Sequence, residues 1–109
     1  MPHPIRLGRL RHRIVIEEPV ETADGAGGVL RTWREAATAW ASVEAVSAAA
    51  RFEAVQAGQT VSHRVVMRAR QDLTTRHRLR RGTTVYELRS VHATPAEDFV
   101  LVLAQETAP

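Results

Sequence analysis

Apolar and polar residues alternate one by one in a series of short runs along this chain. In the first run, Leu10–Pro19, Ile14 and Ile16 share one face because successive side chains of a strand point to opposite sides. Further runs occupy Val29–Glu35, Thr38–Val46, Thr60–Arg70, His77–Arg81, Val85–Val91 and Phe99–Gln105. We predict a mainly all-β fold, a small antiparallel β-barrel or sandwich of about six short strands.

Glycine-containing segments separate several of these runs. Ala23–Gly28 holds three glycines within four residues, which predicts a mobile connection. Gly82-Thr83-Thr84 is typical of a tight turn and predicts a hairpin of the runs on either side. The last run opens with the continuously apolar Phe99–Leu103, which predicts burial on both faces.

The segment 45–59 breaks the alternation and is expected to be one short helix or a long loop. Ser47 is a suitable N-cap and Gly58 a suitable stop, and Phe52 and Val55 lie three residues apart on one helix face. A helix of about ten residues is marginal in water without packing. We therefore expect it to become ordered when something docks against it.

The length of 109 residues suits one domain, 1–109, with a flexible N-terminal tail at 1–8. Many of the apolar residues are alanines and only five are aromatic, which predicts a thin core. Association with copies or partners would then add stability. Trp33 and Trp40 are expected to cover a sheet face or a subunit contact.

Positive charge is concentrated in one part of the chain. His63–Arg81 holds seven arginines against the single acid Asp72, an excess of six charges, whereas the whole chain carries +3. Arg64, Arg68 and Arg70 form a row on the polar face of their run. Such a row indicates nucleic-acid contact or a solvated, partner-paired face. No stacking aromatics are interleaved with it, as a single-strand binder would require.

Patterns that would indicate catalysis or a cofactor are missing from the sequence. There is no cysteine, and the five histidines lack metal-ligand spacing. Glu17-Glu18 and Glu97-Asp98 are expected to be ordinary solvated charges at strand ends, because adjacent strand residues face opposite ways. We predict no enzyme, no metal and no cofactor, and no membrane span or signal segment, as in a cytoplasmic protein.

Six weak motifs in a fixed order resemble the phage head-tail joining family, also called head-tail adaptor or head-closure proteins, of tailed phages and phage-like gene transfer agents. The resemblance covers nearly the whole chain. Its elements are Gly8–Glu21, Thr32-Trp33 after the glycine loop, Ala37–Ser47, His63–Arg70, Arg81–Val91 and Glu97–Glu106.

The resemblance implies a structural β-barrel protomer in a homo-oligomeric ring of six or twelve copies, at the head-tail interface of a virion assembled in the host cytoplasm. The ring would meet a portal or adaptor ring on the head side and a tail terminator or tail tube on the tail side. As a head-closure (stopper) or adaptor component it would retain and pass double-stranded DNA without reading its sequence.

The resemblance also suggests roles for particular residues. The segment ahead of the His63 strand can project into the channel in this family, and it corresponds here to Ala45–Gln59. Its channel-loop candidates are Ser47, Arg51, Phe52, Glu53 and Gln56. The candidates for contact with channel DNA are Arg64, Arg68 and Arg70, and Trp33 and Trp40 are the interface candidates.

Two other functions remain open at this point. The concentrated arginines also suit a nucleic-acid-binding barrel of the OB type, which would bind short oligonucleotides as a monomer with steep salt dependence. A tail terminator ring is a second structural role that the sequence does not separate from head closure.

Overall fold

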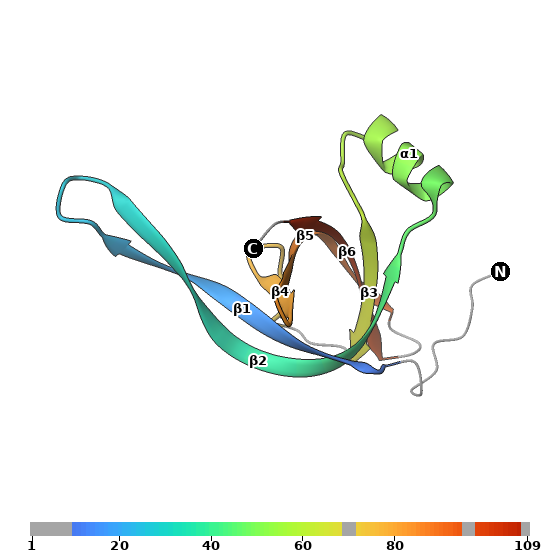
Figure 1. Ribbon diagram of the computed structural model, residues 1–109, viewed down its shortest axis with the longest axis horizontal. Coiled ribbons are helices and arrows are strands. Elements are labelled where there is room, and N and C mark those ends of the chain that lie inside the picture. The colour runs from blue at the N-terminus through green and yellow to red at the C-terminus, as the bar shows by residue number, and fades with distance from the viewer. Residues whose placement is uncertain (1–9, 69–71, 95–97, 108–109) are drawn as a thin grey trace.

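A closed six-stranded antiparallel barrel forms the body of the protein in the computed structural model, which describes residues 10–68, 72–94 and 98–107 (Figure 1). The strand order is β1-β2-β3-β6-β5-β4, with β4 paired back to β1. The strands are β1 (His12–Ala23), β2 (Val29–Ala45), β3 (His63–Arg68), β4 (Arg78–Arg81), β5 (Thr84–Thr94) and β6 (Phe99–Thr107), and α1 (Ala48–Gln56) is the one helix described. The mainly-β prediction is confirmed, with the barrel as the architecture. The predicted tail at 1–8 lies outside the described residues.

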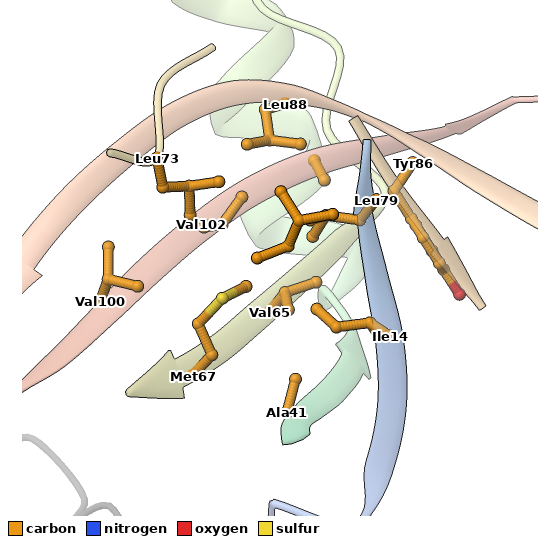
Figure 2. Close-up of a cluster of buried hydrophobic side chains, with 12 residues drawn as sticks. Ile14, Ala41, Val65, Met67, Leu73, Leu79, Tyr86, Leu88, Val100 and Val102 are labelled. Carbon is orange, nitrogen blue, oxygen red and sulfur yellow. The ribbon is translucent and has the colours of Figure 1, made fainter. Parts of the chain in front are cut away.

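The core is a cluster of side chains inside the barrel, contributed by alternate residues of the strands and by Leu73, which lies ahead of β4 (Figure 2). The predicted inward face of β1 is confirmed, because Ile14 and Ile16 are both buried. Tyr86 is the largest fully buried side chain, and loss of water contact raises the pKa of its hydroxyl. The cluster consists of Ile14, Ile16, Ala41, Val65, Met67, Leu73, Leu79, Tyr86, Leu88, Val100, Val102 and Ala104.

The β1–β2 hairpin is longer than the barrel is tall. Only Val15–Glu17 of β1 pair with β4, and only Ala41–Ala45 of β2 pair with β3. Residues 18–34 project as a two-stranded ribbon that we call the arm, at the left of Figure 1. The arm is mostly solvent-exposed, and all of residues 21–32 are exposed.

Two runs that the sequence separates, Val29–Glu35 and Thr38–Val46, are one continuous strand. A β-bulge between Ile16 and Glu17 shifts the register, so that Ile16 lies opposite Ala37 and Glu17 opposite Glu35. The bulge adds a residue to β2 and reverses which side chains face inward. The break in alternation is therefore a bulge within a strand, and the prediction of two strands is wrong.

The tip of the arm is a hydrogen-bonded turn between β1 and β2, and the mobility expected of this glycine segment stays a prediction. The Asp24 carboxylate accepts hydrogen bonds from the backbone N–H groups of Ala26 (2.8 Å) and Gly28 (2.9 Å). Gly25 and Gly27 take φ values of +83° and +85°, which glycine adopts without strain. The glycines supply turn geometry, and the aspartate holds it.

We predict that the arm tip loosens in acid. The two backbone N–H groups on its carboxylate hold the pKa of Asp24 below the ordinary value of 3.8. Because the folded pKa is lowered, this stabilisation is present above about pH 4 and is lost as the pH falls through the folded value. The Ala26 and Gly28 amide signals, followed by NMR from neutral to strongly acidic pH, should shift with a midpoint below the ordinary value.

The matched control for this titration is Asp24→Asn, which keeps a hydrogen-bond acceptor but does not ionise. Its amide signals should stay constant over the same pH range. A midpoint at or above the ordinary aspartate value in the unaltered protein would contradict the prediction.

The helix predicted after β2 is confirmed with both of its caps. The Ser47 hydroxyl accepts a hydrogen bond from the Ala50 N–H at 3.1 Å. Gly58, at φ +80°, ends the helix, and the next residue, Gln59, donates its N–H to the Ala54 carbonyl. No residue of α1 is buried, and Figure 1 shows it standing away from the barrel beyond β2 and β3. The caps thus come from the segment itself and not from the barrel.

The hairpin predicted at Gly82 is also confirmed. Arg81 lies opposite Thr84, so Gly82 and Thr83 form a two-residue turn with Gly82 at φ +60°. The expected burial of both faces of β6 is wrong. Val100 and Val102 are buried inside the barrel, whereas Leu101 and Leu103 on the outer face remain half-exposed.

Candidate interaction surfaces

The arm root carries a buried carboxylate, that of Glu17. Glu17, whose side chain is only 10% exposed, accepts hydrogen bonds from the Nε of Arg78 at 2.8 Å and the Nε of Arg80 at 3.4 Å. The expectation that Glu17 is an ordinary solvated charge is therefore wrong. Its two arginines alternate on β4, a spacing that places both on the outer face of the strand beside β1. This ion-pair cluster joins the arm strand to the strand that closes the barrel.

Replacing Glu17 with glutamine should lower the free energy of unfolding by about 1–2 kcal/mol. Removing one partner of a fully buried pair costs about 3–5 kcal/mol, and the partial exposure of Arg78 and Arg80 reduces that figure through solvent screening. Urea unfolding of the purified protein measures the change. Glu18→Gln is the control, because Glu18 pairs with Arg34 at the surface and its loss should cost about 0.5 kcal/mol or less. Equal effects of the two substitutions would contradict the prediction.

Trp33 and Trp40, the predicted interface residues, both lie on β2 and both contact an arginine. The Arg78 guanidinium lies 4.3 Å from the ring centre of Trp33, which is half-buried. The Arg13 guanidinium lies 5.7 Å from the ring centre of Trp40, which is 54% exposed. Trp33 therefore packs at the arm root, while Trp40 presents a large apolar surface to solvent.

A groove of about 520 Å³ lies where the arm meets β4 and β5. Arg31 and Trp33 of the arm face it from one side, and Arg76, Arg78 and Glu87 from the other. Arg31 is paired with Glu21 at 2.6 Å, and Arg78 with Glu17, so much of the positive charge of the groove is already compensated. The groove is polar, which suits a polypeptide contact better than an apolar ligand.

The structure places Arg64 and Arg68 together on the exposed face of β3, as the sequence predicts. Val65 and Met67 between them are buried in the core. Arg64 donates to Glu44 at 3.1 Å, so its charge is partly neutralised, while Arg68 lies exposed at the strand end. Arg70, the third predicted residue, lies outside the described residues.

The predicted channel-loop residues of segment 45–59 come together on one exposed projection. Phe52 is 64% and Val55 56% exposed, and with Val46, Ala48 and Arg51 they line a shallow hollow of about 450 Å³. This hollow is mainly apolar. The residues Ser47, Arg51, Phe52, Glu53 and Gln56 are all exposed on this projection.

Histidine and acidic side chains do not gather into a metal-binding group anywhere in the part of the chain that the structure describes. The Ser62 hydroxyl lies 2.8 Å from Nδ1 of His63, but the same oxygen accepts the Glu106 N–H at 2.7 Å and Ser62 is buried. His63 in turn packs edge-on to Tyr86, with ring centres 5.2 Å apart. This arrangement ties β3 to β6 and β5. Within the same described ranges, no helix is long and apolar enough to span a bilayer.

Comparison with known proteins identifies the family of this chain. The family model described as phage head completion protein matches residues 5–107. Protein SF1141 from Shigella flexneri 2a, whose solution structure is known, is 30% identical with a TM-score of 0.74, covering 95% of this chain and 98% of that one. A chain of the native gene transfer agent virion shares the fold at 24% identity and a TM-score of 0.64, covering 91% and 96%. No curated protein sequence matches.

The family match confirms the resemblance to head-tail joining proteins that the ordered sequence motifs suggest. It spans every strand of the barrel, the arm and α1. The protein therefore belongs to the phage head completion protein family.

Proposed function

We propose that this protein closes the packaged head of a phage or phage-like particle, as a ring of copies between the portal and the tail. Its role is structural, as the family supports. The ring holds six or twelve copies, meets the portal or adaptor ring on one side and the tail terminator or tail tube on the other, and retains and passes double-stranded DNA. A tail terminator ring is the nearest alternative within the same structural class.

The observation that carries this proposal is the pair of projections on a closed barrel. A closed barrel has no free sheet edges, so it offers little backbone for association. The arm and the α1 projection instead extend outward, and both expose apolar side chains: Val29 and Leu30 on the arm, Phe52 and Val55 on the helix. Two separate exposed elements suit a subunit that must contact neighbours in a ring and a second protein layer.

Cryo-electron microscopy of intact particles that carry this protein is the direct test. We expect ring density for the barrel between portal and tail, with α1 reaching toward the channel axis. Particles with complete tails and no such density between portal and tail would overturn the proposal. Ring density for the barrel on the tail itself, beyond the adaptor ring, would favour the tail terminator role.

The row on β3 provides a second test, which concerns DNA. Replacing Arg64 and Arg68 together with glutamine should leave the barrel folded and the ring assembled, but filled heads should retain less DNA because cations facing phosphate are lost. DNA protected from nuclease in purified heads is the measurement. Arg34→Gln, on the arm, is the control. Failure of ring assembly in the double variant would instead assign these arginines to a subunit interface.

The OB-type alternative receives less support from the structure than from the sequence. Three arginines of the basic stretch, Arg64, Arg78 and Arg80, are already paired with carboxylates. We expect the isolated protein to bind short oligonucleotides weakly. Tight binding by the monomer that weakens steeply with salt would restore this alternative.

A further inference from the structure

The barrel is closed, but the arm leaves two strand edges open. On β2, residues Val29–Glu35 pair with β1 on one side, and within the part of the chain that the structure describes no strand pairs with their other edge, because pairing with β3 begins only at Ala41. On β1, residues 18–23 likewise pair only with β2, because pairing with β4 ends at Glu17. Open edges present unpaired N–H and C=O groups and are templates for another strand. An isolated two-stranded ribbon is also only marginally stable in water.

The hydrogen-bond pattern shows which backbone groups face each open edge. The Asp24 N–H donates to the Gly28 carbonyl at 3.1 Å, so this pair is bonded across the hairpin. Bonded and non-bonded pairs alternate along an antiparallel ladder. Arg31 opposite Glu21, and Trp33 opposite Pro19, are therefore non-bonded pairs whose backbone groups point outward.

This geometry makes the two edges unequal. On β1, the outward position between the barrel and Glu21 is Pro19, which has no N–H to donate, and proline on an edge strand blocks further pairing. On β2, the outward-facing N–H groups of Arg31, Trp33 and Glu35 are all present. Since β1 is blocked, β2 is the edge of the arm that is open to a new strand.

A second copy of the protein offers the same single open edge, so two arms meet β2 to β2, antiparallel about a two-fold axis. In the register with Trp33 opposite Trp33 of the second copy, the outward-facing backbone N–H and C=O groups of the two strands meet. This register also places Arg31, which already pairs with Glu21 of its own arm at 2.6 Å, opposite Glu35 on both sides of the axis. Glu35 forms no ion pair with any residue that the structure describes, so its carboxylate is available to that arginine.

Neighbouring registers are less favourable because they bring like charges together or lose the ion pair. Sliding one strand along the other, in either direction, places Arg31 opposite Arg31, Arg34 opposite Arg34, or Glu35 opposite Glu35. The register centred on Trp33 also carries the exposed Val29 and Leu30 of each tip toward the Ala37–Trp40 end of the other strand, where Trp40 is 54% exposed.

We infer that the free protein forms a two-fold dimer through the β2 edges of its arms, in the register that pairs Arg31 with Glu35 of the second copy. In a ring whose copies all point the same way, neighbours meet head to tail, so no two of them are related by a two-fold axis through their contact. The dimer therefore covers the edge before assembly and must separate when the ring forms. The inference concerns the free protein and stands apart from the head-closure proposal.

Charge exchange between two variants provides the sharpest test. Arg31→Glu and Glu35→Arg should each dimerise about tenfold or more weakly than the unaltered protein, because each places like charges opposite one another. Mixing the two variants should restore dimerisation, since every contact across the axis is then of opposite charge. Sedimentation velocity over a range of concentrations measures all three. A mixture that stays monomeric while the unaltered protein dimerises would overturn the register.

A backbone test separates strand pairing from side-chain contact. Arg31→Pro removes the outward N–H and should abolish the dimer, whereas Arg31→Ala keeps that N–H and should retain most of it. Thermal unfolding checks that both variants keep the barrel, and hydrogen exchange at the Trp33 amide should slow with concentration only where dimers form. An unaltered protein that remains monomeric at all concentrations, or an Arg31→Pro variant that dimerises normally, would overturn the inference. Either result leaves the ring density in particles untouched.

Discussion

Replacing Leu79 with alanine should lower the free energy of unfolding by about 3 kcal/mol, the largest effect that we expect from a single substitution. Leu79 is fully buried and lies on β4, a strand of only four residues that closes the barrel between β1 and β5. Alanine would leave a cavity facing Ile16 and Tyr86, the residues opposite it on the two neighbouring strands. Urea unfolding measures the loss directly.

Thr83→Ala is the matched control for this substitution, because Thr83 is exposed in the adjoining turn and contributes nothing to the core. Its effect should stay within about 0.5 kcal/mol. If Leu79→Ala were equally mild, β4 would not hold the barrel closed, and the closure would have to depend on the Glu17 ion pairs instead.

Replacing residues 48–60 with Asn-Gly should have the largest functional effect: heads should fill but lose their DNA before the tail attaches. The strands already meet at the base of this projection, where the Val46 N–H donates to the Ser62 carbonyl at 3.0 Å. In this register Ser47 lies opposite the buried Val61, so Asn-Gly can join these two residues as a two-residue turn. Because α1 buries no side chain, the thermal stability of the barrel should change little.

A double substitution separates the length of the projection from its apolar surface. Phe52→Ser with Val55→Ser keeps the helix caps and the length of the segment but removes the exposed apolar groups. If this variant leaks DNA as the shortened protein does, docking through the apolar face retains the DNA. Heads that keep their DNA in both variants would show that α1 does not retain the DNA. Its exposed apolar face would then serve another contact.

Local chemistry in the sequence was enough to predict the elements whose ends are set by nearby residues. Ser47 and Gly58 bound α1 because capping involves atoms only a few residues away. Gly82 sets its hairpin for the same reason. The side of β3 that bears Arg64 and Arg68 follows from alternation alone. These features required no knowledge of tertiary packing.

Features that depend on distant strands were missed. The bulge at Ile16/Glu17 lets β1, a strand of twelve residues, stay paired with β2 as β2 curves around the barrel. Nothing in the local sequence distinguishes such a bulge from the end of a strand. The burial of Glu17 depends on arginines 61 and 63 residues away. A useful signal was the alternation of Arg78 and Arg80 around the apolar Leu79, which places two cations on one face, where a single carboxylate can pair with both.

The separation of the arm from the core makes its length adjustable. Each residue added to both strands of a ribbon lengthens it by about 3.4 Å. An even number of added residues keeps every existing side chain on its face, whereas an odd number reverses the faces beyond the insertion. Related chains are therefore free to set the reach of their tips in steps of about 7 Å while keeping the same barrel.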